Sequence, residues 1–175
     1  MGSPERYTPE PFADLVTEAF DGEITVDPAS CARANKTIKA KHYYDIAANG
    51  LIQPWKGNVF LNPPYDNMRN WVDKLLDEFN RYTVKQAILL SNTATDTEWF
   101  DLLCCPFNRT EPIFCHVVGR IKFISGVGSK IDQPRYPSTF TYFGDNKLKF
   151  CEVFSRVGNL SKLVKPSDFK EQLCA

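Results

Sequence analysis

Hydrophobic residues recur at helical spacing in two segments of the chain, with short apolar runs between them. The first helical face consists of Phe12, Leu15, Val16, Ala19 and Phe20, and the second of Met68, Trp71, Val72, Leu75, Leu76 and Phe79. Residues 24–26, the residues just before Asn62, and residues 86–90 form apolar runs short enough to be buried strands. Strands that alternate with helices predict an α/β fold with a largely parallel sheet.

The last third of the chain has a different pattern. Residues 138–143 and 149–154 are rich in aromatic and β-branched side chains and flank the turn-forming Gly144-Asp145-Asn146. This arrangement predicts an antiparallel C-terminal hairpin. Residues 123–137 contain glycine and lysine without clear periodicity and are expected to form a mobile loop.

Length and charge limit the organisation of the protein. The 175 residues suit one domain, expected over residues 4–175, and leave no room for a separate target-recognition domain. Basic and acidic residues balance at 21 each, but residues 1–114 carry a net charge of −5 and residues 115–175 a net charge of +5. The basic part is where contacts to nucleic-acid phosphates are expected.

Cysteine and histidine residues give no sign of a metal site. The six cysteines form no Cys-x-x-Cys pair, and the two histidines complete no ligand spacing with them, so we expect reduced cysteines and no metal. No signal peptide and no apolar run of about 20 residues is present. We therefore expect an intracellular, soluble protein without membrane contact, located in the cytoplasm, or in the host cytoplasm for a viral protein.

The most informative segment is Asn62-Pro63-Pro64-Tyr65, directly after an apolar run. An exocyclic ring amine is a poor nucleophile because its lone pair is delocalised. The Asn62 side-chain oxygen and the Pro63 carbonyl can accept its two hydrogens and orient that lone pair. Tyr65 can stack on the ring, as aromatic residues do with an extruded base. The alternative is an ordinary turn, since Asn-Pro and Pro-Pro are common turn sequences.

Further blocks accompany this tetrapeptide in a fixed order. They are residues 7–9, 24–30, 50–51, 55–57, 71–74, 95–100, 119–123 and 137–138. Together they resemble the phage-type, Dam-like DNA N6-adenine methyltransferases over about residues 7–154. The chain departs from that pattern in having Asn49 where an acidic residue is common, and in lacking a Gly-x-Gly after Asp27.

The resemblance implies a fold, a cofactor and a site. The implied fold is a Rossmann-like class I methyltransferase, whose largely parallel sheet the antiparallel C-terminal hairpin would close, and the implied cofactor is S-adenosylmethionine. The catalytic residues are then Asn62, Pro63, Pro64 and Tyr65, the cofactor-binding residues Tyr7, Thr8, Pro9, Asp27, Pro28 and Asp45, and the DNA-binding residues Arg120, Lys122, Lys130 and Arg135.

Several of these residues have a simpler interpretation. Asp27 can cap a following helix, although the cofactor role is favoured. Asp45 lies 18 residues beyond Asp27, close to the separation typical of a ribose contact, but can equally be a solvated loop residue. Residues 7–9 can be a plain helix entry in which Thr8 is the cap. The basic residues between Arg33 and Lys41 are interpreted mainly as a solvated helix face.

We therefore expect transfer of a methyl group from S-adenosylmethionine to the N6 amine of adenine in DNA. Two alternatives stay open. One is methylation of a glutamine side-chain amide in a protein, where Asn-Pro-Pro-Tyr also occurs. The other is a non-catalytic subunit that binds cofactor or DNA within a methylation complex.

Overall fold

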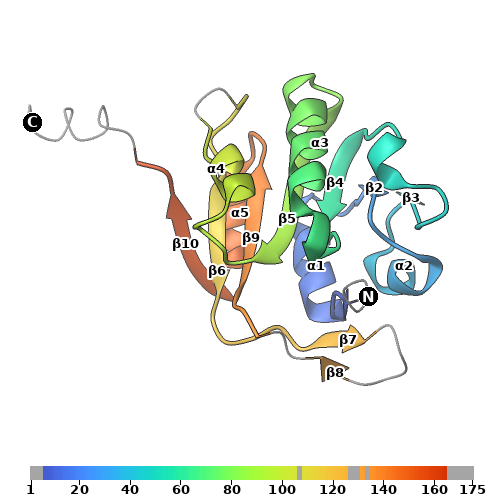
Figure 1. Ribbon diagram of the computed structural model, residues 1–175. Helices are drawn as coiled ribbons and strands as arrows, with labels where there is room; N and C mark the ends of the chain where they lie inside the picture. The colour runs from blue at the N-terminus through green and yellow to red at the C-terminus, as the bar shows by residue number, and fades with distance from the viewer. Residues whose placement is uncertain (1–5, 106–107, 126–130, 133–134, 165–175) are drawn as a thin grey trace, which may run out of the picture.

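The computed structural model describes residues 6–105, 108–125, 131–132 and 135–164 (Figure 1). Its strands are β1 (Arg6–Tyr7), β2 (Val26–Asp27), β3 (His42–Tyr43), β4 (Gly57–Leu61), β5 (Val84–Asn92), β6 (Ile113–Val117), β7 (Phe123–Ser125), β8 (Ile131–Asp132), β9 (Ser138–Phe143) and β10 (Gly158–Lys162). Its helices are α1 (Glu10–Ala19), α2 (Ala32–Ile38), α3 (Met68–Asn80), α4 (Glu98–Leu103) and α5 (Lys147–Phe154), with 3-10 turns η1 (Gly50–Ile52) and η2 (Tyr65–Asn67).

The main sheet has the strand order β10-β6-β9-β5-β4-β2-β3. Strands β3, β2, β4 and β5 are parallel neighbours, whereas β9 lies antiparallel between β5 and β6, and β10 is antiparallel to β6. The predicted α/β class is confirmed. The sheet is mixed rather than largely parallel, since three of its six strand pairs are antiparallel.

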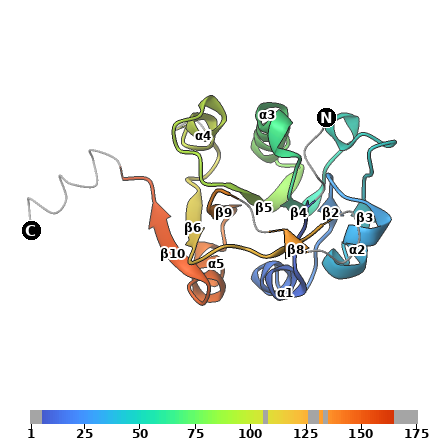
Figure 2. The ribbon, with the colours of Figure 1, turned by 60° about the horizontal axis from the view of Figure 1, so that its bottom comes forward.

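Helices cover both faces of this sheet (Figure 2). Helices α3 and α4 lie on one face, and α1, α2 and α5 on the other. Each face has its own hydrophobic cluster, because the central strands β4 and β5 carry buried apolar side chains on both sides. The predicted helical faces are confirmed, with Val16 and Ala19 of α1 and Val72 and Leu75 of α3 all fully buried.

The predicted C-terminal hairpin is wrong in its second strand. Residues 147–154 form helix α5, which packs on the sheet through Phe150, Val153 and Phe154. These side chains recur at i, i+3 and i+4, a helical spacing that their aromatic and β-branched character concealed. The Phe150 ring stacks on Tyr142 with centroids 5.0 Å apart, so burial against β9 overrides strand propensity. The antiparallel partner of β6 at this edge is β10 instead.

A second, three-stranded sheet has the order β1-β7-β8. Its strands β7 and β8 fall in the segment expected to be an irregular loop, and this part of the expectation is corrected. Residues 126–130 and 133–134 of that segment lie outside the described residues. Strand β1 pairs antiparallel with β7, which places the N-terminal segment beside residues far along the chain. No helix within the described ranges has both the length and the apolar character needed to cross a bilayer.

Candidate active site

A cavity of about 430 Å³ lies where the parallel strands β2, β3 and β4 end. Ligands of open α/β sheets bind at this carboxyl edge, because the loops that follow the strands diverge there. The cavity is lined by residues 6–8, 27–31, 44–46, 49–50 and 62–65, together with Ala34, Ile38, Phe60 and Trp71.

Most of the predicted site residues meet in this cavity. Its lining includes Tyr7, Thr8, Asp27, Pro28, Asp45, Asn62, Pro63, Pro64 and Tyr65. Pro9, Arg120, Lys122 and Arg135 are not part of the lining, and Lys130 lies outside the described residues. Their roles as ligand contacts stay predictions, but the expected cofactor and catalytic segments share one space.

Asn62 follows β4 and is held by its amide nitrogen. Nδ2 donates to the main-chain oxygen of Arg6 and to Oγ1 of Thr8, both at 3.1 Å. Because a carbonyl oxygen can only accept, the nitrogen of the amide must face Arg6. Oδ1 is left on the opposite side of the side chain and takes part in no hydrogen bond within the described residues. Asn62 Oδ1 is thus left able to accept a hydrogen bond from a ligand.

The two prolines give the loop its stiffness. Pro63 is buried, Pro64 is exposed, and neither has an amide hydrogen to donate. The Pro64 carbonyl accepts the Asn67 amide at 3.4 Å, which starts the 3-10 turn η2. No main-chain hydrogen bond to the Pro63 carbonyl occurs in the described part of the chain. That oxygen therefore remains able to accept from a ligand.

Tyr65 is half-buried and packs against the hydrophobic cluster beneath α3. Its hydroxyl is buried without a hydrogen-bond partner in the described residues. Burial raises the pKa of the Tyr65 phenol to about 12, so the hydroxyl stays protonated at neutral pH. Burying a hydroxyl without a partner costs free energy, and the ring is the part of Tyr65 that can stack on a base.

Asp27 ends β2 and is only 3% exposed. Its Oδ1 accepts the Ala29 amide at 3.3 Å, and no Lys, Arg or His side chain within the described ranges pairs with it. Burial raises the pKa of Asp27 to about 7, against smaller opposing effects of the Ser30 hydroxyl and the Ala29 amide. The Ser30 hydroxyl lies close enough to lower the pKa of Asp27. Its buried Oγ nevertheless forms no hydrogen bond of normal geometry with any described group.

The helix-capping interpretation of Asp27 is wrong. Helix α2 has Cys31 as its N-cap, whose sulfur accepts the Ala34 amide at 3.4 Å. The Cys31 thiol also contacts the Tyr7 hydroxyl at 3.5 Å, which ties the first segment of the cavity to the second. The Asp27 carboxylate is thereby left for another partner.

The expected role of Thr8 as a helix cap is also wrong. Pro9 is the N-cap of α1, and no side chain caps this helix. Thr8 is 3% exposed, and its hydroxyl accepts from Asn62 instead. A hydroxyl before Pro is a common helix-entry signal, so sequence alone could not show that its partner lies 54 residues away.

Asp45 follows β3, the parallel neighbour of β2. The carboxylate is exposed and accepts the Ala48 amide at 2.9 Å, so it shapes its own loop while also lining the cavity. Both interpretations of this residue fit its position, and a ribose contact stays a prediction.

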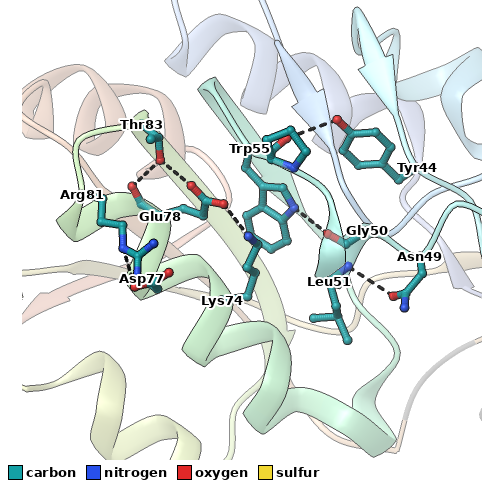
Figure 3. Close-up of polar contacts among 11 residues, drawn as sticks. Tyr44, Asn49, Gly50, Leu51, Trp55, Lys74, Asp77, Glu78, Arg81 and Thr83 are labelled. Carbon is teal, nitrogen blue, oxygen red and sulfur yellow. Dashed lines mark hydrogen bonds and ion pairs between the residues drawn. The ribbon is translucent and has the colours of Figure 1, made fainter.

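Asn49 and Gly50 form a further part of the cavity wall, and neither was among the predicted site residues. Asn49 has φ 51° and accepts the Leu51 amide with Oδ1 at 3.3 Å, so it caps η1. A Cβ at Gly50 would lie 1.9 Å from the Pro28 carbonyl oxygen. The buried Trp55 indole donates to the Gly50 carbonyl at 2.8 Å (Figure 3). Only glycine permits this close contact between two walls of the cavity.

Trp55 is itself supported from α3. Figure 3 shows Lys74 beside the indole, with its Nζ 5.8 Å from the ring centroid, and an ion pair between Lys74 and Glu78. The Thr83 hydroxyl donates to Glu78 as well, at 2.6 Å. Lys74, held by its ion pair with Glu78, thus packs beside the buried indole whose N–H contacts Gly50.

The expected DNA-binding residues lie outside the cavity. Arg120 and Lys122 are exposed, whereas Ile121 and Phe123 beside them are buried, so the predicted alternation is confirmed. Arg135 is exposed too. On α2, the guanidinium of Arg33 lies 5.4 Å from the centroid of the Tyr7 ring. No group of three or more potential metal ligands is found among the described residues.

The cavity lies at the carboxyl edge of an α/β sheet, where such folds bind ligands, and an oriented asparagine followed by two prolines forms part of its wall. The family model for DNA N-6-adenine-methyltransferase (Dam) matches residues 6–151, and the chain belongs to this family. The match confirms the resemblance drawn from the sequence blocks. No curated protein matches the chain. Family membership implies methylation of adenine at N6 in DNA.

Proposed function

We propose that the chain transfers a methyl group from S-adenosylmethionine to the N6 amine of a flipped adenine in DNA. The observation that carries the proposal is the orientation of Asn62, whose Oδ1 is left without a partner in the described residues beside an unpaired buried carboxylate. The reaction is assigned to one catalytic domain over residues 4–175 with a Rossmann-like class I arrangement.

The lining of the cavity fits this cofactor. Asp27 is a buried carboxylate without a cationic partner in the described residues, which matches the ammonium of the methionine moiety. The unpartnered Ser30 hydroxyl can accept from the same ammonium. Asp45, at the end of the neighbouring strand, suits the ribose hydroxyls. Tyr7, Thr8, Pro9 and Pro28 form or adjoin the walls. The bound cofactor supplies a methyl group activated by its sulfonium.

The residues of the Asn-Pro-Pro-Tyr loop act on the amine. Asn62 Oδ1 and the Pro63 carbonyl each accept one N6 hydrogen, which directs the nitrogen lone pair away from the ring. The ring of Tyr65 stacks on the base. A new N–C bond forms as the C–S bond breaks, and the extra proton leaves the nitrogen for solvent, since the neutral Asn62 side chain is no base. No covalent enzyme intermediate is needed.

DNA is held chiefly through its phosphates. Residues 115–175 carry a net charge of +5, and Arg120, Lys122, Lys130 and Arg135 belong to this part. Contacts to phosphates position a duplex without reading its sequence. We therefore expect a short or relaxed recognition sequence.

The test offers DNA, RNA and protein in parallel to the enzyme with radiolabelled S-adenosylmethionine. The expected product is N6-methyladenine in DNA, identified by mass spectrometry of nucleosides. The Asn62→Ala variant is the matched control, and loss of one catalytic hydrogen bond of this kind costs about 100- to 1000-fold in kcat. Label in protein glutamine or RNA but not in DNA, or no transfer by any route, would overturn the proposal.

A further inference from the structure

We propose that Thr8 and the main-chain carbonyl of Arg6 form a two-acceptor clamp that orients the Asn62 amide, so that Thr8 is a positioning residue for methyl transfer. This inference rests on the proposed function and deepens it. It gives the buried Thr8 hydroxyl a role distinct from a cofactor contact.

The hydrogen-bond pattern makes the clamp directional. Both hydrogens of Asn62 Nδ2 are used, one by Arg6 O and one by Thr8 Oγ1, each at 3.1 Å. In the flipped amide, Oδ1 would face the Arg6 carbonyl oxygen, and two acceptors would meet without a hydrogen between them. The Arg6 carbonyl thus sets which end of the amide faces inward. Thr8 sets its tilt by fixing the second hydrogen.

The clamp is rigid because regular structure holds it on both sides. Arg6 and Tyr7 form β1, which pairs with β7 in the register Arg6–Ser125 and Tyr7–Ile124. Pro9, directly after Thr8, begins α1. Thr8 therefore lies between a paired strand and a helix end, and it is buried. Catalytic groups supported in this way keep their geometry without reorganisation during the reaction.

Helix capping does not explain the hydroxyl of Thr8. Helix α1 has no side-chain cap, although Thr8 lies just before its N-cap Pro9. The hydrogen bond from Asn62 gives the buried oxygen a partner. Because Thr8 also lines the cavity, a direct contact with the cofactor is the competing explanation. The two explanations differ in which kinetic constant a substitution changes.

The decisive variants are Thr8→Val, which removes the hydroxyl at nearly constant volume, and Thr8→Ser, which keeps it. We expect Thr8→Val to lower kcat about 3- to 10-fold, the effect of one neutral hydrogen bond, with the Kd for S-adenosylmethionine changed less than about twofold. Thr8→Ser should keep most of the activity. Thr17→Val is the control, because Thr17 is a half-buried residue of α1 outside the cavity.

A double-mutant cycle with Asn62→Ala tests whether Thr8 acts through Asn62. Adding Thr8→Val to Asn62→Ala should cause no further loss of kcat, since the group that it positions is gone. Additive losses would overturn the clamp. A rise in the cofactor Kd that matches the loss of kcat would instead make Thr8 a cofactor contact.

A second measurement tests the clamp without depending on enzymatic activity. In ¹⁵N-resolved spectra, the Asn62 side-chain amide hydrogens should exchange slowly with solvent in the wild type and in Thr8→Ser. They should exchange faster in Thr8→Val, or in Thr8→Ala if the valine variant does not fold. Equal exchange in all variants would refute the clamp. If the wild-type protein methylates no DNA, the proposed function fails, while these spectra still decide the clamp.

Discussion

The buried carboxylate of Asp27 should lower the stability of the cofactor-free protein at neutral and alkaline pH. Its pKa is raised by burial from 3.8 to about 7, so the folded protein binds a proton at this site more tightly than the unfolded chain. The free energy of unfolding should therefore fall as pH rises between about 4 and 7. Above that range the destabilisation by the ionised Asp27 carboxylate should be fully present. The difference between the two pKa values corresponds to about 4 kcal/mol.

Replacing Asp27 by Asn removes this charge and keeps an oxygen that can accept the Ala29 amide. We expect Asp27→Asn to be more stable than the wild type by about 2–4 kcal/mol at pH 8, since a buried neutral amide still has some desolvation cost. The gain should be about 2–3 kcal/mol smaller at pH 5, where the wild-type carboxyl is largely protonated in the folded state. The same variant should bind S-adenosylmethionine much more weakly, because its ammonium loses the carboxylate.

Denaturant unfolding at pH 5 and pH 8 without cofactor measures the first effect, and calorimetric titration measures the second. Asp14→Asn, on the exposed side of α1, is the control for removal of a surface charge. Other carboxylates also titrate in this range, so the informative quantity is the difference between variant and wild type. A variant that is less stable at pH 8, or whose gain does not change with pH, would refute the reasoning. An unchanged Kd for S-adenosylmethionine would show that the Asp27 carboxylate does not bind the cofactor.

Five further substitutions test Tyr65, Gly50 and the expected DNA-binding residues. Tyr65→Phe should keep near-normal kcat and stability because the hydroxyl is buried without a partner in the described residues, whereas Tyr65→Ala should lose about 1–3 kcal/mol of base stacking; equal damage in both would exclude stacking. Gly50→Ala should raise the cofactor Kd at least about tenfold, since its Cβ would lie 1.9 Å from the Pro28 carbonyl oxygen; calorimetry that shows unchanged binding would mean that this wall does not contact cofactor. Arg120→Ala and Lys122→Ala should weaken DNA binding across many sequences and lower the salt slope by about one per lost phosphate contact; titrations at several salt concentrations check this, and affinity indifferent to salt would contradict it.

Local patterns in the sequence were sufficient to predict the helices and strands whose apolar residues recur at regular spacing. Helix α3 and strand β5 were predicted because their side chains meet the core at regular intervals, and burial of such faces is the main source of stability. The same reasoning failed at α5. There the aromatic residues of 147–154 favour a strand by local propensity, and the choice of a helix depends on the apolar face of β9 that they cover.

The chemistry of the site was partly determined by the sequence itself. Asn62 with two prolines specifies a stiff loop with free acceptors, because proline fixes φ and carries no amide hydrogen. Asp27 at a strand end specifies a carboxylate at the ligand edge of the sheet. Both features follow from the type of residue and its position relative to a strand, and the amino-acid sequence alone gives both.

Only the tertiary structure decided which groups hold these residues in place. Thr8 and Asn62 are 54 positions apart, and the contact of Gly50 with Pro28 depends on how two loops meet. The raised pKa of Asp27 likewise arises from the whole environment that excludes water from its carboxyl. Hydrogen-bond partners and burial are properties of the folded chain, because they depend on distances between segments that sequence spacing does not fix.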